Sequence, residues 1–429
     1  MNSKSYALTG ALMLALSAVP MAQAYDFKAG SVYYNFTSPQ KKGAAVTYLN
    51  LQDNLEAYLD DVTIPGTVKY QISDIPVRGI EDHALFNCQF VTSVTIEEGP
   101  TYIFDQAFSH CYSMKTLSLP STMAYIGDYA FEYCEDLTSV TLPAALEELG
   151  TSVFTFCNSL TEIKVEEGNK FFEDADGILY MKGRNMLIQY PAGKENFSFE
   201  IPAGVKYVTD YAFCPAPYLG MVTIGPDVER IRTLTFADCY SLMEINVDEA
   251  NENNSSVDGV LFDKNVETLI QYPLARATNE YALPETTKAI GPMSMTGTAS
   301  VKNLVLPESL TSIGDYAFMA SFFSTITCKA AVPPAVGNSG FDDNTCQNTT
   351  LFVPEESIDA YRTAPVWSSF RNIQAIGSAS AGNIVSAPEA VSSRLYDLQG
   401  RPADGLTNGI VIRVTTFSDG SVTREKITL

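Results

Sequence analysis

The chain of 429 residues is poor in the side chains on which most catalytic and metal sites depend. It has only two histidines, His83 and His110, and they share no metal-ligand spacing. It contains no G-x-S-x-G, P-loop or H-E-x-x-H motif. Neighbouring carboxylates such as Glu166 and Glu167 follow a predicted strand, where a solvated turn explains them better than a glycosidase pair. The sequence therefore predicts a protein that is not an enzyme and that binds no metal or organic cofactor.

Basic residues are also scarce, with 27 Lys and Arg against 50 Asp and Glu, which gives a net charge of −23. This charge repels phosphate backbones and anionic lipids, and it argues against binding to nucleic acid or to a membrane surface. Residues 1–24 combine Lys4, an apolar run from Ala7 to Val19 and a small-residue site at 22–24, which is typical of a secretory signal. No later run approaches the roughly 18 apolar residues that span a bilayer, so no transmembrane helix is expected.

What the chain does contain is an internal repeat. An apolar residue, usually the Phe of an Ala-Phe-x-x-Cys pattern, recurs at intervals of 23 residues that are twice lengthened to 59. We call these residues the anchors, and they are Leu85, Phe108, Phe131, Phe154, Phe213, Phe236, Met295 and Phe318. A repeat this short cannot bury its own apolar face, so neighbouring copies are predicted to stack into a solenoid with a continuous core.

Each copy of the repeat carries further apolar residues at fixed distances from its anchor. In the copy at 126–143, IGDYAFEYCEDLTSVTLP, the last apolar residues alternate with polar ones, which predicts a strand ended by the proline. The segment around the anchor is too short for a long helix and predicts one helical or 3-10 turn on the opposite side. The predicted strands should form one parallel sheet, and they centre on Val94, Leu117, Val140, Ile163, Val222, Ile245 and Leu304.

Each long interval contains an insert of 36 residues, at about 166–201 and 248–283. The two inserts share matching stretches, DGILYMKGRNMLIQYP at 176–191 and DGVLFDKNVETLIQYP at 258–273. Two apolar segments around a polar turn predict a β-hairpin in each insert. The Asp-Gly pair fits a turn, because the spaced acidic ligands of a calcium loop are absent.

The eight cysteines follow the repeat rather than a disulfide pattern. Five of them form a ladder at one position of successive copies, namely Cys88, Cys111, Cys134, Cys157 and Cys239. This predicts buried structural thiols rather than nucleophiles beside a histidine, although adjacent coils about 4.8 Å apart leave a ladder disulfide open on distance. Outside the ladder, Cys328 and Cys346 form the most plausible bridge.

Composition divides the mature chain into four segments. Alternating runs at 25–72 predict an N-terminal β cap, and residues 73–376 hold the repeats and a C-terminal cap. In that cap a strand at 350–353 is expected to close the array, and the stretch EESIDAYRTAPVWSSF predicts a short helix with the single tryptophan. Residues 377–390 are rich in Gly, Ala and Ser and predict a linker. Residues 391–429 predict a small β module.

The exposed positions of the predicted strands would line the concave face of the solenoid. They are mostly hydroxyl and amide side chains without an aromatic platform, and two interpretations stay open, recognition or a simple scaffold in which Thr suits strands. The candidate binding residues are Lys115, Thr116, Ser118, Thr138, Ser139, Thr141, Thr161, Glu162, Lys164, Met221, Glu244 and Asn246.

The units IGDYAFEYCEDLTSVTLP and IGDYAFMASFFSTI resemble the BspA-like leucine-rich repeats of bacterial surface proteins, notably those of Bacteroidetes. The insert SVDGVLFDKNVETLIQYP and the stretch LFVPEESIDAYRTAPVWSSFRNIQAI are similar to segments of that family, so the resemblance covers about residues 25–376. The tail YDLQGRPADGLTNGIVIR resembles C-terminal sorting segments of the type IX secretion system. The resemblance implies a right-handed α/β solenoid, secreted or on the outer-membrane surface, often linked to adhesion and without transferable catalytic or ligand residues.

Together these observations favour a non-catalytic, secreted or surface-attached binding protein, an adhesin that recognises a host or bacterial surface protein or glycan. Two alternatives stay open. The protein could be an envelope scaffold or nutrient-capture component, or a hydrolase with an unrecognised site. The hydrolase would need a deep pocket with converging polar groups.

Overall fold

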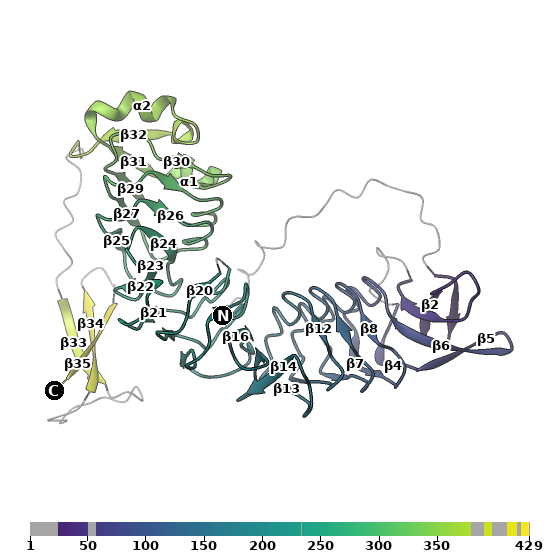
Figure 1. Cartoon of the computed structure of the whole chain (residues 1–429). Coiled ribbons are helices and arrows are strands. Elements are labelled where there is room, and N and C mark those ends of the chain that lie inside the picture. The colour runs from purple at the N-terminus through teal and green to yellow at the C-terminus, as the bar shows by residue number, and fades with distance from the viewer. Residues whose placement is uncertain are drawn as a thin grey trace. The chain divides into compact units, whose positions relative to one another are not determined.

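The computed structural model describes residues 25–49, 57–232, 234–378, 390–396, 410–417 and 422–428. The predicted signal at 1–24 and most of the predicted linker at 377–390 lie outside the described residues. The chain forms two compact units, residues 1–254 (unit 1) and 255–429 (unit 2). In each unit, short strands and turns stack as successive coils, with little helix (Figure 1).

Two rows of strands run through unit 1, because each regular coil contributes one strand on each of two sides of the core. The first row carries the L-x-x-V-x-L pattern, and we call it the long-strand row. Its members are β4 (Asp60–Ile64), β7 (Val91–Ile96), β9 (Thr116–Ser118), β11 (Ser139–Leu142), β13 (Glu162–Val165), β17 (Ser198–Glu200), β19 (Met221–Ile224) and β21 (Glu244–Val247). The short-strand row precedes the anchors and contains β6 (Ser73–Ile80), β8 (Tyr102–Ile103), β10 (Tyr125–Ile126), β12 (Glu148–Leu149), β16 (Met186–Gln189), β18 (Tyr207–Val208) and β20 (Arg230–Ile231).

The long strands pair in parallel and in the expected register, as Val140 opposite Ile163 shows. The prediction of one continuous sheet is wrong, however, because the row in unit 1 divides into β4-β7-β9, β11-β13 and β17-β19-β21. Strand β9 has only three residues, and the Thr138 N–H meets the Lys115 carbonyl at a long 3.4 Å. After β13 the first insert interrupts the row.

At the N-terminus, β1 (Phe27–Ala29), β2 (Val32–Phe36) and β3 (Ala44–Thr47) form an antiparallel meander. Strand β3 then pairs in parallel with β6, so these strands extend the short-strand row, and β5 (Thr67–Tyr70) pairs antiparallel with β6. The predicted boundary of a separate cap at residue 72 stays a prediction.

Unit 2 repeats the same two rows. Its short-strand row is the sheet formed by β22 (Asn254–Val257), β23 (Val260–Asp263), β24 (Thr268–Gln271), β26 (Ala289–Ile290), β28 (Ser312–Ile313) and β30 (Ala335–Val336). Its long-strand row is formed by β25 (Glu280–Ala282), β27 (Asn303–Leu306), β29 (Thr325–Cys328), β31 (Thr350–Val353) and β32 (Asn372–Ala375). A separate antiparallel sheet contains β33 (Ala390–Tyr396), β34 (Ile410–Phe417) and β35 (Val422–Thr428), within the predicted β module.

The anchors form the axis of the core, as predicted. The rings of Phe108, Phe131 and Phe154 stack at centroid distances of 5.2 and 5.7 Å, and all three are buried. Tyr190 stacks on Phe213 at 5.4 Å and lies 23 residues before it, so it is an anchor that the sequence pattern did not reveal. Each interval of 59 residues is therefore one enlarged coil of 36 residues followed by one regular coil.

The segments around the anchors are hydrogen-bonded turns, and the predicted helical or 3-10 turns are not found there. Around Phe131, the flanking Tyr129 and Tyr133 have left-handed φ values of 55° and 58°. This alternation turns the Phe131 N–H toward the next coil, where it donates to the Val153 carbonyl at 3.0 Å. A helix cannot form because its i to i−4 hydrogen bonds would require that same N–H.

Both enlarged coils contain the predicted hairpin. In the first, β15 (Ile178–Met181) pairs antiparallel with β16, which returns to the short-strand row beside β18, and the preceding β14 (Phe172–Ala175) pairs antiparallel with the other side of β15. In the second, β23 and β24 take the same places before β26. Their equivalence extends to the anchor of each enlarged coil, Tyr190 and Tyr272.

All eight cysteines lie in the described part of the chain, and they are buried and form no disulfide. The Cys328–Cys346 bridge is therefore absent, and the Cys328 Sγ lies 3.2 Å from the Tyr361 hydroxyl instead. In the ladder, the Cys134 Sγ donates to the Phe108 carbonyl of the preceding coil at 3.3 Å.

The expected helix is present in the C-terminal part of the array. It is α2 (Ile358–Thr363), between the 3-10 turns η2 (Glu355–Ser357) and η3 (Trp367–Ser369); a second short helix, α1 (Asp343–Asn348), precedes β31. The Trp367 Nε1 donates to the Pro334 carbonyl at 2.8 Å. The array does not close at residues 350–353, because β32 follows the helix and pairs in parallel with β31.

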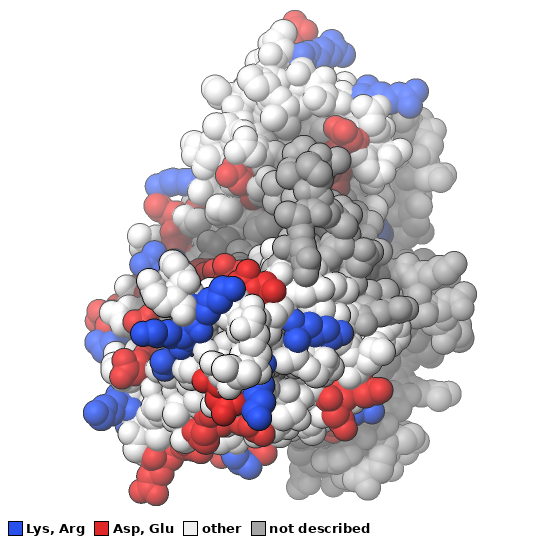
Figure 2. Space-filling model, turned by 90° about the vertical axis from the view of Figure 1, so that its right-hand side faces the viewer, with Lys and Arg blue, Asp and Glu red and all other residues white. Residues whose placement is uncertain are grey.

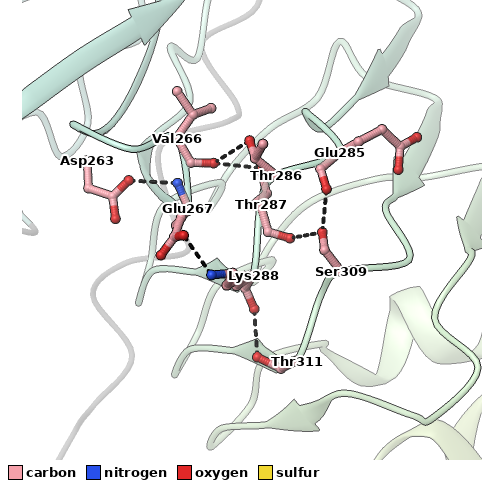
Figure 3. A network of polar contacts seen from close by, with 9 residues as sticks. All are labelled: Asp263, Val266, Glu267, Glu285, Thr286, Thr287, Lys288, Ser309 and Thr311. Carbon is pink, nitrogen blue, oxygen red and sulfur yellow. Dashed lines mark hydrogen bonds and ion pairs between the residues drawn. The ribbon is translucent and has the colours of Figure 1, made fainter.

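Polar side chains also connect successive coils along their edges. In unit 2, the Lys288 Nζ lies 2.6 Å from the Glu267 Oε1, and the Ser309 Oγ donates to the carbonyls of Glu285 and Thr287 at 2.7 and 2.6 Å (Figure 3). The Thr311 hydroxyl donates to the Lys288 carbonyl. Exposed ion pairs of this kind stabilise only slightly, so the buried anchors dominate the stability.

Candidate binding surface

The long-strand row aligns most of the predicted binding residues into transverse lines. The parallel register of β11 and β13 places Ser139 opposite Glu162 and Thr141 opposite Lys164. Thr116 lies on β9, in the neighbouring sheet, which a long hydrogen bond from the Thr138 N–H to the Lys115 carbonyl joins to the next coil. Alternation along each strand turns these side chains away from the core, while Val140 and Ile163 are buried. The remaining predicted residues of these coils lie beside them and are exposed, namely Lys115, Ser118, Thr138 and Thr161.

Hydrogen bonds fix part of this surface. The Thr161 hydroxyl donates to the Thr138 carbonyl at 3.1 Å, so it continues the strand ladder and is less available to a partner. Lys164 and Glu162 form an ion pair at 2.8 Å on the exposed edge of β13. The hydrogen bond from Lys164 and the negative charge of Glu162 raise the pKa of the Lys164 ammonium group.

The predicted residues Met221, Glu244 and Asn246 lie apart from this group. They belong to β19 and β21, in the separate sheet β17-β19-β21. The first hairpin intervenes, since the Ile163 N–H donates to the Gly177 carbonyl at 2.8 Å. The predicted binding residues therefore lie on three sheets of the row, β4-β7-β9, β11-β13 and β17-β19-β21. We call the face on β9, β11 and β13 the hydroxyl face.

Charge does not gather into a single patch. Figure 2 shows Lys and Arg side chains interspersed with Asp and Glu side chains over the face in view. On this face the mixed charges agree with the interpretation of the acidic residues as solvated surface. The hydroxyl face offers short hydroxyl groups with few charges, a chemistry suited to hydrogen bonds with protein or glycan.

The residues around His110 come closest to a catalytic arrangement. The Ser109 Oγ lies 2.8 Å from the His110 Nδ1 and 3.4 Å from the Glu132 Oε2. Burial raises the pKa of the Glu132 carboxyl to about 7 and lowers the pKa of His110. In a serine triad the histidine bridges serine and carboxylate, whereas here the serine lies between the other two. Among the residues described, no three His, Cys, Asp or Glu side chains are placed to hold a metal ion.

A cleft of about 610 Å³ lies elsewhere, where β12 ends the first part of the short-strand row and β16 begins the next. We call it the row-break cleft. Its walls are mostly apolar and include Leu149, Phe154 and Ile188, and no histidine or cysteine lines it. Sequence reasoning did not identify it, although the change of interval from 23 to 59 residues marks its position along the chain.

Helices that could cross a bilayer were sought throughout the described ranges, and none is long and apolar enough. No curated protein matches the chain.

Solved structures with related folds come from several bacteria. A leucine-rich cell surface protein of Faecalibacterium prausnitzii A2-165 shares 22% identity, with 72% of this chain and 96% of that chain covered and a TM-score of 0.42. The pneumococcal vaccine antigen PcpA shares 18% identity over 82% of this chain and 98% of that chain, with a TM-score of 0.39. A leucine-rich repeat protein of Bacteroides ovatus ATCC 8483 shares 19% identity over 82% and 77%, with a TM-score of 0.35.

A family model provides the assignment. The model of the BspA type leucine rich repeat region matches residues 59–175, 193–273 and 273–362, in six copies. These segments include the regular coils, the second enlarged coil and the start of the C-terminal helix, and they cover more than half of the chain. The protein therefore belongs to the BspA-type leucine-rich repeat family.

Proposed function

We propose that the protein is a non-catalytic, secreted or surface-attached adhesin that binds a host or bacterial surface protein or glycan through its hydroxyl face. Membership of the family supports this proposal, as does the description of the Faecalibacterium relative as a cell surface protein. The observation that carries it is the in-register pairing of Ser139 with Glu162 and of Thr141 with Lys164 on β11 and β13, where Ser139, Thr141 and Lys164 are exposed.

The proposed site has the features of a recognition surface rather than of a catalytic one. The hydroxyl groups lie on hydrogen-bonded strands, so little conformational entropy is lost when a partner binds. Neither histidine nor cysteine lines the row-break cleft, so a Ser-His or Cys-His pair of a hydrolase cannot form there. An envelope scaffold or nutrient-capture role would use the same surface and differs in the partner.

The test compares binding of the purified protein to a panel of extracellular-matrix proteins and to a glycan array. Ser139→Arg and Thr141→Arg place large charged groups on the hydroxyl face without entering the core. Ala145→Arg is the matched control, because Ala145 is exposed in the loop that follows β11. We expect the two face variants to weaken binding at least tenfold and the control to leave it unchanged. Equal binding by all three variants would refute the role of this face.

A further inference from the structure

The row-break cleft exists because a coil is displaced. In the regular array, β8 pairs in parallel with β10, and β10 pairs in parallel with β12. After β12 the chain enters the first enlarged coil, and β16 pairs with β15 and β18 instead. Strand β12 is therefore the edge of its sheet, and the cleft lies against this edge.

In the anchor turn that follows β12, backbone N–H groups that donate to the next coil elsewhere in the array make no such hydrogen bond. In the two preceding coils, the N–H groups of Phe108 and Phe131 donate to the next coil, to the carbonyls of Ala130 and Val153 at 2.8 and 3.0 Å. The equivalent N–H of Phe154 donates to no acceptor in the described part of the protein. The same holds for the N–H of Ser152, and the Ser152 Oγ is buried without a hydrogen-bond partner. Both residues line the cleft.

The edge strand has matching unused acceptors. The Ala124 carbonyl accepts from the Glu147 N–H at 2.9 Å, and the Ile126 carbonyl accepts from the Gly150 N–H at 2.8 Å. One coil later, the equivalent carbonyls of Glu147 and Leu149 accept from no group among the described residues. The cleft therefore offers carbonyl acceptors along β12 and N–H donors along the anchor turn that follows it.

We propose that the row-break cleft binds an extended, uncharged apolar peptide segment, which adds to the β12 edge in the place of the displaced coil. A peptide backbone supplies N–H groups to Glu147 and Leu149 and carbonyl groups to Ser152 and Phe154, as a next coil would. Alternate side chains would contact the apolar wall that includes Val153, and addition to a sheet edge is a recurrent mode of peptide recognition.

Charge at the rim favours an uncharged segment. Glu147 and Glu148 lie on one wall, and Arg230 and Arg232 line the opposite one. Arg232 is also within 3.7 Å of the Asp210 carboxylate. With Asp210, three carboxylates and two arginines line the cleft, so a strongly acidic or strongly basic peptide meets like charges there. This site is on the short-strand row, so the proposal does not depend on the hydroxyl face.

The test measures binding of the peptide acetyl-Thr-Val-Thr-Val-Thr-Val-Thr-amide to the purified protein by isothermal titration calorimetry. Two N-methylated versions carry methyl groups either on the valine amides or on the inner threonine amides. Alternate N–H groups of a strand point to opposite sides, so one version blocks the groups that face β12 and the other does not. We expect the unmethylated peptide to bind and one methylated version to bind at least tenfold more weakly than the other.

Variants locate the binding site. Ile188→Trp fills the cleft from β16 and should weaken peptide binding at least tenfold, while Ile72→Trp adds the same ring at a fully exposed position and should not. Circular dichroism establishes that both variants fold, and Met186→Trp replaces Ile188→Trp if that variant unfolds. Ser139→Arg on the hydroxyl face should leave peptide binding unchanged. No binding at 1 mM peptide, equal binding of the two methylated versions, or equal binding by the Trp variants would overturn the proposal.

Discussion

At the scale of single residues, the cysteine ladder acts as a series of buried hydrogen-bond donors. The thiols of Cys111, Cys134 and Cys157 each donate to the anchor carbonyl of the preceding coil at 3.2 to 3.3 Å. Ser321 takes the same position in unit 2 and donates to the Met295 carbonyl at 2.8 Å. The sequence pattern indicates only that this position requires a small residue. The structure adds that a donor there gives the anchor carbonyl a second hydrogen bond, beside the one it accepts from the backbone N–H three residues later, as the Phe108 carbonyl does from Cys111.

The buried thiols should make the protein sensitive to alkali. Burial raises the pKa of Cys111 to about 12 from an ordinary value of 9.0. The thiol ionises more readily in the unfolded chain, so its contribution to stability is present below pH 9 and is lost as the pH rises toward 12. We expect the urea midpoint, followed by circular dichroism, to fall less between pH 8 and pH 10.5 in Cys111→Ser than in the unmodified protein.

The control is the urea midpoint of Cys111→Ser against that of the unmodified protein at pH 7. Because serine keeps a hydrogen-bond donor at this position, this comparison measures the effect of the substitution apart from the ionisation of the thiol. Equal decreases in the two proteins would show that the thiol is not the group that titrates.

At the scale of elements, a buried asparagine marks the beginning of each enlarged coil. The Asn169 Nδ2 donates to the carbonyls of Pro143 and Leu146 at 3.0 and 2.9 Å, and its Oδ1 accepts from the N–H groups of Phe171 and Phe172 at 2.8 Å. Asn251, at the equivalent position of the second enlarged coil, makes the same set of contacts with its own neighbours. Each asparagine therefore replaces the backbone contacts that the chain loses where it leaves the regular path.

Asn169→Ala should be one of the more damaging polar substitutions in the chain. It leaves the Leu146 carbonyl and the N–H groups of Phe171 and Phe172 without their partner, while the Pro143 carbonyl keeps the Leu146 N–H, and we expect a loss of about 2–4 kcal/mol in the free energy of unfolding. Urea denaturation measures this loss. Asn158→Ala removes an exposed asparagine eleven residues earlier and should change the free energy by less than about 0.5 kcal/mol.

A loss below about 1 kcal/mol for Asn169→Ala would show that the hairpin holds this coil without the asparagine. The same substitution at Asn251 tests whether the two enlarged coils are equivalent in energy as well as in geometry.

At the scale of the whole molecule, stability is expected to be a sum of contacts between neighbouring coils. Most backbone ladders join one coil to the next, so a local defect affects adjacent coils first. The tail at 391–429 has its own antiparallel sheet, with no strand pairing to the repeats among the described residues. It lies beyond β32, the last strand of the array.

We predict that the tail is an export or attachment module that the repeats do not need for folding. Deletion of residues 391–429 should leave the unfolding midpoint of the repeats unchanged and reduce the amount of protein at the cell exterior. Circular dichroism of the purified protein and cell fractionation measure the two effects. Normal export of the truncated protein would refute the sorting role, and loss of folding would make the tail part of the C-terminal cap.

The sequence alone determined the repeat, its register and the buried positions. An apolar residue every 23 positions, such as Phe131 and Phe154, can be buried only by stacking, and a strand period of two places Val140 inward and Thr141 outward. The hairpins were also predictable, because a polar turn between apolar segments is a local signal. Family membership followed from the same motifs.

The tertiary structure alone decided how the coils pack where the regular array is interrupted. Tyr190 was not recognisable as an anchor, because the apolar residue before it on the short-strand row, Leu187, lies three rather than five positions away. The helical turns failed because the anchor N–H groups bond to the next coil, and that partner is distant in sequence. The cleft exists only where the enlarged coil leaves β12 without its neighbour. Such a gap depends on contacts that are not made, and a residue pattern cannot record them.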